Sequence, residues 1–216
     1  AEWYKRQGRE AVIPAAITVK LSVFEDTGAI VAAMTTSIPE SAHSGRNWDY
    51  RYCWLRDAFF VVRALNSLSE VGTMEDYLRW LGNVVTDAGS GHIQPLCGIG
   101  LERDLPEATV PTLAGYRGMG PVRVGNQAAE HFQHDVYGNI ILGAAQAFHD
   151  HRLLHRAGLS EFTRLELVGE QAVRVYGQPD AGMWELRTRA RVHTPPALMS
   201  WAACDRLEKI AVALQL

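Results

Sequence analysis

The segment from Arg46 to Asp57 combines large aromatic side chains with paired charges, a combination that suits sugar binding. Four aromatic residues occupy every second position and an adjacent arginine and aspartate end the segment: Trp48, Tyr50, Tyr52 and Trp54, then Arg56 and Asp57. Aromatic rings pack against the C–H faces of sugars, and charged side chains hydrogen-bond their hydroxyl groups. The alternative interpretation is a buried aromatic segment with one internal ion pair.

A second segment that suits chemistry, residues 179–185, ends in an adjacent tryptophan and glutamate. Glycoside hydrolysis uses two carboxyl groups that flank the scissile bond, one of which protonates the leaving oxygen. Glu185 is a candidate for this acid. Trp184 can supply an apolar wall that favours the protonated carboxyl, and Gly182 lets the backbone turn into a cleft. A glutamate at the edge of a surface loop is the alternative interpretation.

Three histidines in one expected helix, His149, His151 and His155, invite a metal-site interpretation. His151 and His155 are one helical turn apart, as metal ligands can be. Solvated surface histidines give the same pattern, and no phosphate-binding or nucleophile motif accompanies them. We therefore expect no metal and no cofactor.

The composition excludes several function classes. With 216 residues, of which 47% are hydrophobic, the chain is long enough for one globular domain. A net charge of −3 gives no electrostatic footprint for nucleic acid, and no apolar stretch reaches the roughly 20 residues that span a bilayer. The three cysteines, Cys53, Cys97 and Cys204, are far apart in the sequence and fit neither a disulfide framework nor a zinc site. They favour a reducing, cytoplasmic location.

Helical periodicity dominates the elements that must position these residues. The expected helices cover residues 9–25, 55–69, 73–87, 134–157, 160–177 and 194–214. A loop rich in glycine and proline runs from 89 to 125, and a loop of that length in a compact domain is usually functional or disordered. Because no segment alternates strongly in hydrophobicity, the sequence predicts an all-α chain.

The segment from Arg46 to Asp57 also resembles the signature of bacterial family 15 glycoside hydrolases, the glucoamylase-like enzymes. Residues 21–40 look like the first barrel helix of that family and the loop after it. Residues 115–118, 121–126 and 135–138 are similar to its middle segment, and residues 179–185 look like the segment with the general acid. The matches occur in order from about residue 11 to residue 210.

The resemblance implies an (α/α)6 toroid, in which twelve helices form an inner and an outer ring. Six helices supply about half of it, so residues 1–216 are expected to form a single domain, the N-terminal portion of the catalytic domain. Neither the N-terminal β-sandwich that is usual in the family nor the C-terminal half of the toroid has a counterpart here. We expect an open half-ring, or a homo-oligomer that closes through the open toroid edge.

The resemblance also assigns roles to residues. It implies that Glu185 is the general acid and that Arg56 and Asp57 grip the sugar whose bond is cut. Other residues expected at the same pocket or cleft are Trp54, Tyr50, Trp184, Arg117 and Gly118. The catalytic base of the family is a glutamate near the far end of the toroid, and no carboxylate here matches its context.

The implied function is hydrolysis of O-glycosyl bonds by an exo-acting, inverting α-glucosidase in the complete enzyme. The expected partner is an α-linked glucoside or oligosaccharide, and the isolated chain is expected to be inactive without the base. Glucoamylase, glucodextranase and trehalase types are not separated at this stage. Two alternatives stay open: a non-catalytic sugar-binding protein, and a helical scaffold or interaction protein.

Two positions depart from the family pattern. Members commonly read His-Thr-x-Ser-Lys after the acid, whereas His193 and Thr194 are followed here by Pro195-Pro196-Ala197, without the lysine. His131 stands where a glutamine is common. The first departure alters the sequence beside the cleft, and we expect the second to have little effect.

Overall fold

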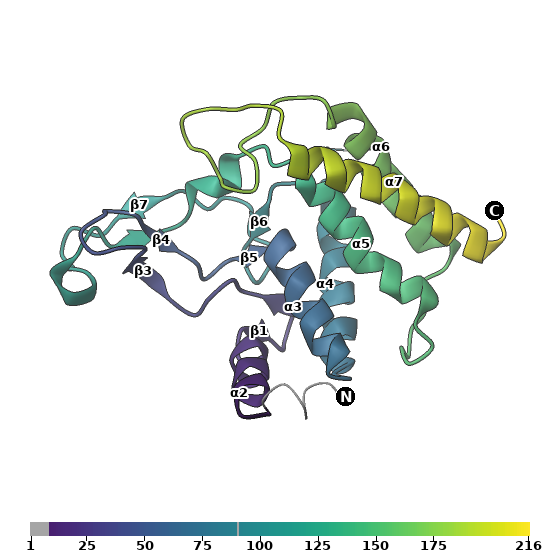
Figure 1. Cartoon of the computed structure of the whole chain (residues 1–216), viewed down its shortest axis with the longest axis horizontal. Helices are drawn as coiled ribbons and strands as arrows, with labels where there is room; N and C mark the ends of the chain where they lie inside the picture. The colour runs from purple at the N-terminus through teal and green to yellow at the C-terminus, as the bar shows by residue number, and fades with distance from the viewer. Residues whose placement is uncertain (1–8, 90) are drawn as a thin grey trace.

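The structure, a computed structural model, describes residues 9–89 and 91–216. Six α-helices lie within these residues: α2 (Arg9–Lys20), α3 (Leu55–Ser67), α4 (Gly72–Ala88), α5 (Asp135–His149), α6 (Leu159–Val175) and α7 (Thr194–Leu214). Helices α3 and α4, and α5 and α6, form antiparallel hairpins (Figure 1). The expected helical fold class, a part of a toroid of helical hairpins, is confirmed.

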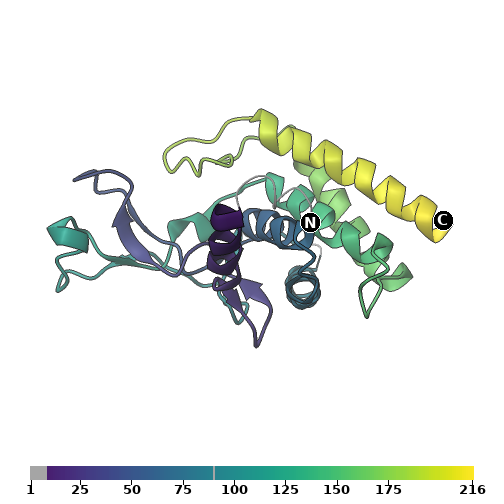
Figure 2. The same ribbon diagram turned by 60° about the horizontal axis from the view of Figure 1, so that its bottom comes forward.

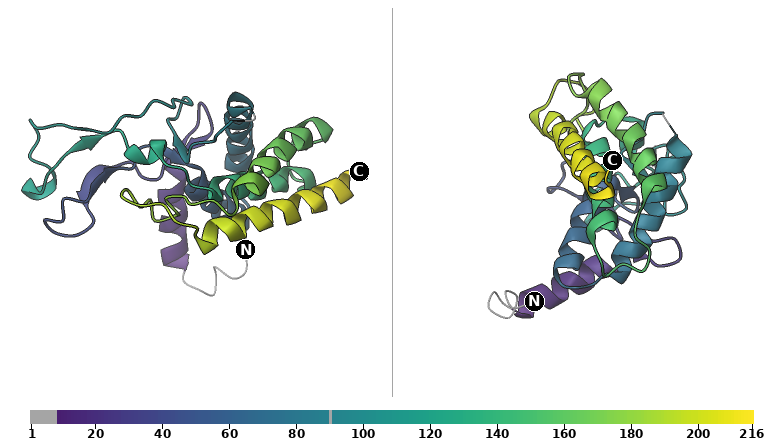
Figure 3. Two further views of the ribbon diagram at one scale, coloured as in Figure 1. Left: turned by 90° about the horizontal axis from the view of Figure 1, so that it is seen from above. Right: turned by 90° about the vertical axis from the view of Figure 1, so that its right-hand side faces the viewer.

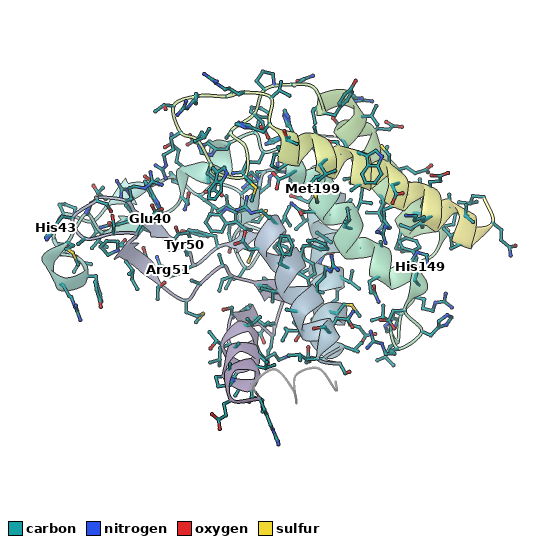
Figure 4. The ribbon with its side chains drawn as sticks, viewed as in Figure 1. Glu40, His43, Tyr50, Arg51, His149 and Met199 are labelled. Atoms are coloured by element: carbon teal, nitrogen blue, oxygen red, sulfur yellow. The ribbon has the colours of Figure 1, made fainter. Side chains whose placement is uncertain are left out.

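Helix α5 is the centre of the helical layer. It packs against α3, α4, α6 and α7, and most of its residues are buried. Gly138 explains its close crossing with α7, because a Cβ atom there would lie 2.4 Å from the backbone oxygen of Met199. Figure 4 marks Met199 beside α5. The helical periodicity of the sequence therefore corresponds to a real core, with α5 inside it.

All three helices α3, α5 and α7 begin at one end of the layer and run away from it, whereas α4 and α6 return (Figures 1 and 2). The long connections from α4 to α5 and from α6 to α7 therefore both lie at the end where α3, α5 and α7 start. Functional side chains on these loops can meet the first turns of the helices there.

A second body of paired loops, which we call the arm, extends from this end away from the helices (Figure 3). It contains β3 (Thr36–Pro39), β4 (Asn47–Asp49), β7 (Ala108–Thr109), β8 (Arg123–Val124) and the 3-10 helix η1 (Tyr116–Gly118). Antiparallel pairs join β3 to β4 and β7 to β8. Side chains on β8 and β3 also connect the pairs: Thr36 Oγ1 donates to Arg123 O at 2.7 Å.

Two further hairpin-like pairs lie nearer the helices. β1 (Val23–Phe24) pairs with β2 (Ala29–Ile30), and β5 (Cys53–Trp54) pairs with β6 (Leu96–Cys97). A second 3-10 helix, η2 (Gln127–Glu130), precedes α5. Each strand has two to four residues, which is too short to show alternation in the sequence, and the all-α class is unchanged.

The expected helix over residues 9–25 ends at Lys20, and residues 21–40 form no helix. The chain turns at Gly28, whose φ of +84° suits glycine. A Cβ atom at Gly28 would lie 2.1 Å from the backbone oxygen of Asp76. Residues 21–40 therefore include a turn packed closely against α4, and do not form the helix that the resemblance implied.

The expected helix over residues 134–157 ends at His149. Asp150, which is buried, accepts hydrogen bonds from the backbone and the guanidinium of Arg152 and forms a turn that stops the helix. Consequently His151 and His155 do not share a helix face, and the metal-ligand spacing inferred from the sequence is wrong. Figure 4 shows His149 at the far end of the layer.

Two cysteines that are far apart in the sequence are neighbours in space. Cys53 and Cys97 lie opposite each other in the β5–β6 pair, and both are free and buried. Burial raises the pKa of Cys53 to about 12 and that of Cys97 to about 11. Both thiols are therefore protonated at neutral pH and pack as small apolar groups.

Large apolar side chains are exposed on α3 and α7. Phe60 on α3 is 60% exposed, and Trp201 and Val212 on α7 are 63% and 71% exposed. Exposed apolar side chains often mark surface where a partner binds when they form a contiguous patch, so these two helices are the candidates for such a surface.

Candidate active site

The loop between α6 and α7, residues 176–193, carries Glu185 to the start of α3. Asp180, which is 1% exposed, anchors this loop because its carboxylate accepts from His134 N at 2.7 Å and from Gly182 N at 3.1 Å. Gly182 has a φ of +66°, and a Cβ atom there would lie 2.8 Å from the ring of His193. The loop therefore needs glycine at this turn, as the sequence indicated.

Glu185 itself has a left-handed backbone, with a φ of +55°. That conformation costs a residue with a side chain roughly 1–2 kcal/mol. Its amide donates to Gly182 O at 3.0 Å, which closes a tight turn. A strained residue of this kind persists only where its surroundings hold it, and such residues cluster at functional sites.

The carboxylate of Glu185 is bound by the two residues that the sequence singled out on the other side. Its Oε1 accepts from Trp54 Nε1 at 2.6 Å and lies 3.4 Å from Arg56 Nη2. The side chain of Glu185 remains 26% exposed. The structure thus joins two segments that are 131 residues apart in the sequence.

Arg56 is the centre of the site. Its Nη2 also lies 3.2 Å from Asp57 Oδ2, and its Nη1 donates to Gln133 Oε1 at 3.3 Å and to Met183 O at 3.4 Å. A guanidinium presents its donors as a planar fork, so these contacts fix its orientation.

Asp57 lies in the first turn of α3, and its pKa is raised. Burial is the main cause, the neighbouring Arg56 opposes it, and the negative charge of Glu185 adds to it. Because Asp57 and Glu185 share one nitrogen of Arg56, their carboxylates lie at or below the lower end of the roughly 6.5–9.5 Å spacing of inverting enzymes. This arrangement suits Asp57 as a hydroxyl acceptor and leaves little room for a water between the two carboxylates.

Behind Arg56 the site has a buried polar floor. Gln133 and Asp135 are 1% and 3% exposed, and Asn139 donates to Asp135 Oδ2 at 2.9 Å. Burial raises the pKa of Asp135, against the opposing charge of Arg56. Within the described part of the chain, Gln133 Nε2 and Asp135 Oδ1 have no hydrogen-bond partner.

Two aromatic rings form a wall beside Glu185. Trp54 is 2% exposed and its ring centroid lies 6.0 Å from that of Tyr50 at an angle of 48°. Burial, followed by the charges of Glu40 and Glu185, raises the pKa of Tyr50. Figure 4 shows Tyr50 where the arm meets the helices.

Trp184 does not supply the apolar wall that was expected of it. Its side chain is 79% exposed, so it cannot shield Glu185 from water, and Trp54 takes that place. An exposed indole next to Glu185 is still available to stack on a ligand.

Arg117 and Gly118 are not brought to this cluster. Both are exposed in η1, at the tip of the arm (Figure 1). The guanidinium of Arg117 lies 5.3 Å from the ring centroid of its neighbour Tyr116.

His131, one of the departures from the family pattern, lies within the electrostatic reach of the acid. Burial lowers its pKa, and the charge of Glu185 opposes this shift. The histidine at this position is therefore close enough to the candidate acid to feel its charge, although we expected it to have little effect.

Sequence reasoning missed Asp180, Gln133 and Asn139. Asp180 had a usable signal: an aspartate two residues before a glycine forms the Asx turn that is observed here. Gln133 and Asn139 had none, because polar residues at the start of a helix are ordinary.

A cavity with a volume of about 450 Å³ lies elsewhere, between α4, α5 and α6. Its two glutamates serve the backbone: Glu75 accepts from Leu154 N, and Glu161 accepts from Gly158 N at 2.9 Å. Volume alone thus does not identify the site, and the convergence of charged and aromatic groups on Glu185 is the better criterion.

Two negative findings concern the described residues alone. They contain no group of three or more histidine, cysteine, aspartate or glutamate side chains arranged to hold a metal ion. None of their helices has the length and apolar character needed to cross a membrane.

Comparison with known proteins gives a family match. Residues 6–215 match the family described as Glycosyl hydrolases family 15. A trehalase of Mycobacterium tuberculosis is 35% identical over 204 residues, which are 91% of this chain and 29% of that protein. A trehalase of Thermoplasma volcanium is 32% identical over 208 residues, 95% of this chain and 32% of that protein. No solved structure gives a significant match. The chain spans about a third of the length of these relatives.

Proposed function

The chain belongs to Glycosyl hydrolases family 15, and we propose that the protein of which it forms a part hydrolyses the O-glycosyl bond of an α-linked glucoside. The observation that supports this most directly is the carboxylate of Glu185, held by Trp54 and Arg56 next to Asp57. An acid, a fork of donors and an aromatic wall are what a glucosyl unit requires.

In this proposal Glu185 is the general acid. Its proton passes to the glycosidic oxygen as the bond from that oxygen to the anomeric carbon breaks. A water oxygen bonds to the anomeric carbon, and the water proton passes to a base. Arg56 and Asp57 bind hydroxyl groups of the glucosyl unit that is released, and Trp54 and Tyr50 limit the pocket. The reaction is exo-acting and inverts the anomeric configuration.

In this proposal, none of the carboxylates in the described part of the chain is the catalytic base. Asp57 shares Arg56 with the acid, and Asp135 is enclosed beneath it with 3% exposure. A base needs access to a water on the opposite face of the sugar. We therefore propose that the 216-residue chain binds a glucosyl unit but does not turn over substrate by itself.

Trehalose is the substrate to test first, because the relatives are named trehalases. The experiment compares release of glucose from trehalose, maltose and isomaltose by the full-length protein. Release from at least one disaccharide is expected, and it should be lost in Glu185→Gln. Absence of release from all three would contradict the proposal.

A second candidate function, a helical module that acts by association, is favoured by the apolar side chains exposed on α3 and α7. Phe60, Trp201 and Val212 lie on surface that a partner would cover. In this case the chain alone should self-associate or bind a hydrophobic dye. A dye-silent monomer in light scattering would exclude association through this face.

A further inference from the structure

A cluster of charged and aromatic side chains joins the loop of Glu185 to the arm. We call it the Arg187 clamp, and its members are Arg187, Glu107, Trp48 and Arg123. The guanidinium of Arg187 lies 3.9 Å from the ring centroid of Trp48. Its two terminal nitrogens donate to the two carboxylate oxygens of Glu107 at 3.0 and 2.7 Å.

The clamp is more than a surface ion pair. The side chains of Glu107, Arg123 and Arg187 are only 16%, 17% and 28% exposed. Arg123 Nε lies 3.1 Å from Glu107 Oε1, and its guanidinium lies 4.8 Å from the ring centroid of Trp48. A two-pronged carboxylate contact combined with stacking on an indole fixes both the position and the plane of Arg187.

This fixed arginine is placed where the loop needs support. Asp180 anchors the loop before Glu185, and Arg187 follows Glu185 by two residues. Glu185 therefore lies between two anchors while its backbone has the left-handed φ of +55°. Trp184, the residue in front of it, is 79% exposed and packs little.

We propose that the Arg187 clamp is a positioning device that holds the Glu185 carboxyl against Trp54 and Arg56 for proton donation. This inference rests on the role of Glu185 as acid in the proposed function. Three members of the clamp come from the arm or its base, since Trp48 is in β4, Arg123 is in β8 and Glu107 precedes β7. The arm thereby takes part in catalysis as a support, without contacting the sugar.

The test uses the full-length protein with Arg187→Ala, Arg187→Lys and the matched control Arg189→Ala, since Arg189 is an exposed arginine on the same loop. Each variant is assayed with an α-glucoside, whose leaving oxygen needs a proton, and with α-glucosyl fluoride, whose leaving fluoride does not. Arg187→Ala should lower kcat on the glucoside about 10- to 100-fold with KM nearly unchanged, because a misplaced acid slows proton transfer. The loss on the fluoride should be much smaller.

Arg187→Lys keeps the charge but not the planar fork, so it should not restore kcat, and Arg189→Ala should match the unsubstituted protein. Equal losses of Arg187→Ala on both substrates, an effect on KM alone, or rescue by lysine would overturn the clamp. If Arg187→Ala does not fold, Glu107→Gln replaces it, and the same dependence on the leaving group is required.

Glu185→Gln separates this inference from the proposed function. If Glu185→Gln leaves turnover of the glucoside intact, the proposed acid is wrong and the clamp fails with it. If Glu185→Gln removes turnover while Arg187→Ala behaves like Arg189→Ala, the acid stands and the clamp alone is wrong.

Discussion

Asp57 and Asp135 at the site, and Glu107 at the base of the arm, are all partly or fully buried carboxylates, yet their pKa values move in opposite directions. At the site, burial prevails over the single cation Arg56, and both pKa values are raised. At Glu107, burial also acts upward, but hydrogen bonds and charges from Arg187 and Arg123 prevail, and the pKa is lowered.

The opposite pKa shifts distinguish a binding site from a cluster that only stabilises the structure. The oxygens of Glu107 are supplied with donors by the protein, so the cluster around it is complete. The site instead leaves Asp135 Oδ1 without a hydrogen-bond donor within the described residues, and Asp57 Oδ2 has only the ion-pair contact with Arg56 at 3.2 Å. Buried acceptors without donors are costly to fold and useful to a ligand rich in hydroxyl groups.

The comparison of the site with the cluster around Glu107 can be tested by substitution, and the largest effect is expected at Glu185. Glu185→Gln should lower turnover of an α-glucoside by the full-length protein about 10²- to 10⁴-fold, because proton donation is lost. The thermal midpoint should change little, since the amide retains an oxygen for Trp54. Glu166→Gln, an exposed glutamate on α6, is the control, and unchanged turnover in Glu185→Gln would refute the assignment.

Glu107→Gln should show the opposite behaviour in the isolated chain, a loss of stability. It leaves Arg123 and Arg187 partly buried without their carboxylate, which should lower the free energy of unfolding by about 1–3 kcal/mol. Denaturant unfolding measures it. Glu170→Gln is the control, because it removes only an exposed pair with Arg174 and should cost about 0.5 kcal/mol or less. Equal effects of the two variants would mean that Glu107 is an ordinary surface charge.

Asp57→Asn should weaken binding without that loss of stability. Replacing a charged acceptor with a neutral amide should reduce glucose binding by the full-length protein by about 1–3 kcal/mol. The free energy of unfolding should stay the same or rise, because a carboxylate disfavoured by burial is removed. Calorimetric titration with glucose and denaturant unfolding test the two halves. A variant that is destabilised but binds normally would place Asp57 among the structural carboxylates.

The helical layer was largely predictable from the sequence because its stabilisation is apolar and periodic. The stripe along α5 and the small residues that let α7 approach it are local features of the sequence. The arm was not predictable in this way, since two- to four-residue strands carry no measurable alternation. Its contacts are between residues distant in sequence, such as the hydroxyl of Thr36 with the backbone oxygen of Arg123.

The site lies between these cases. Trp54, Arg56, Asp57 and Glu185 were identified from residue types and from the family resemblance, and the structure brings them together. Trp184 does not form the apolar wall expected of it, because a tryptophan next to a glutamate in sequence need not pack on it. Gln133 was missed because its importance lies in the contact with Arg56, which is distant in sequence, whereas Asp180 had the signal of an Asx turn.

The smallest expected effect is the dependence of stability on pH, measured by denaturant unfolding of the isolated chain. The folded pKa of Glu107 is lowered, so its contribution to stability is present above its unfolded value and is lost as the pH falls through the folded one. The folded pKa of Asp135 is raised, so the folded chain takes up this proton first. Its burial penalty is relieved as the pH falls through that folded value.

Acidification should therefore act in two stages, with a slight gain from Asp135 at mildly acidic pH and a loss through Glu107 at lower pH. Asp135→Asn should reduce the first change, to which Asp57 also contributes, and leave the second. Glu107→Gln should reduce the second change, to which other carboxylates with lowered pKa values also contribute, and leave the first. If each substitution altered both stages equally, the two regions would titrate as one system. The proposed difference between the site, which lacks hydrogen-bond donors, and the cluster around Glu107, which has them, would then be wrong.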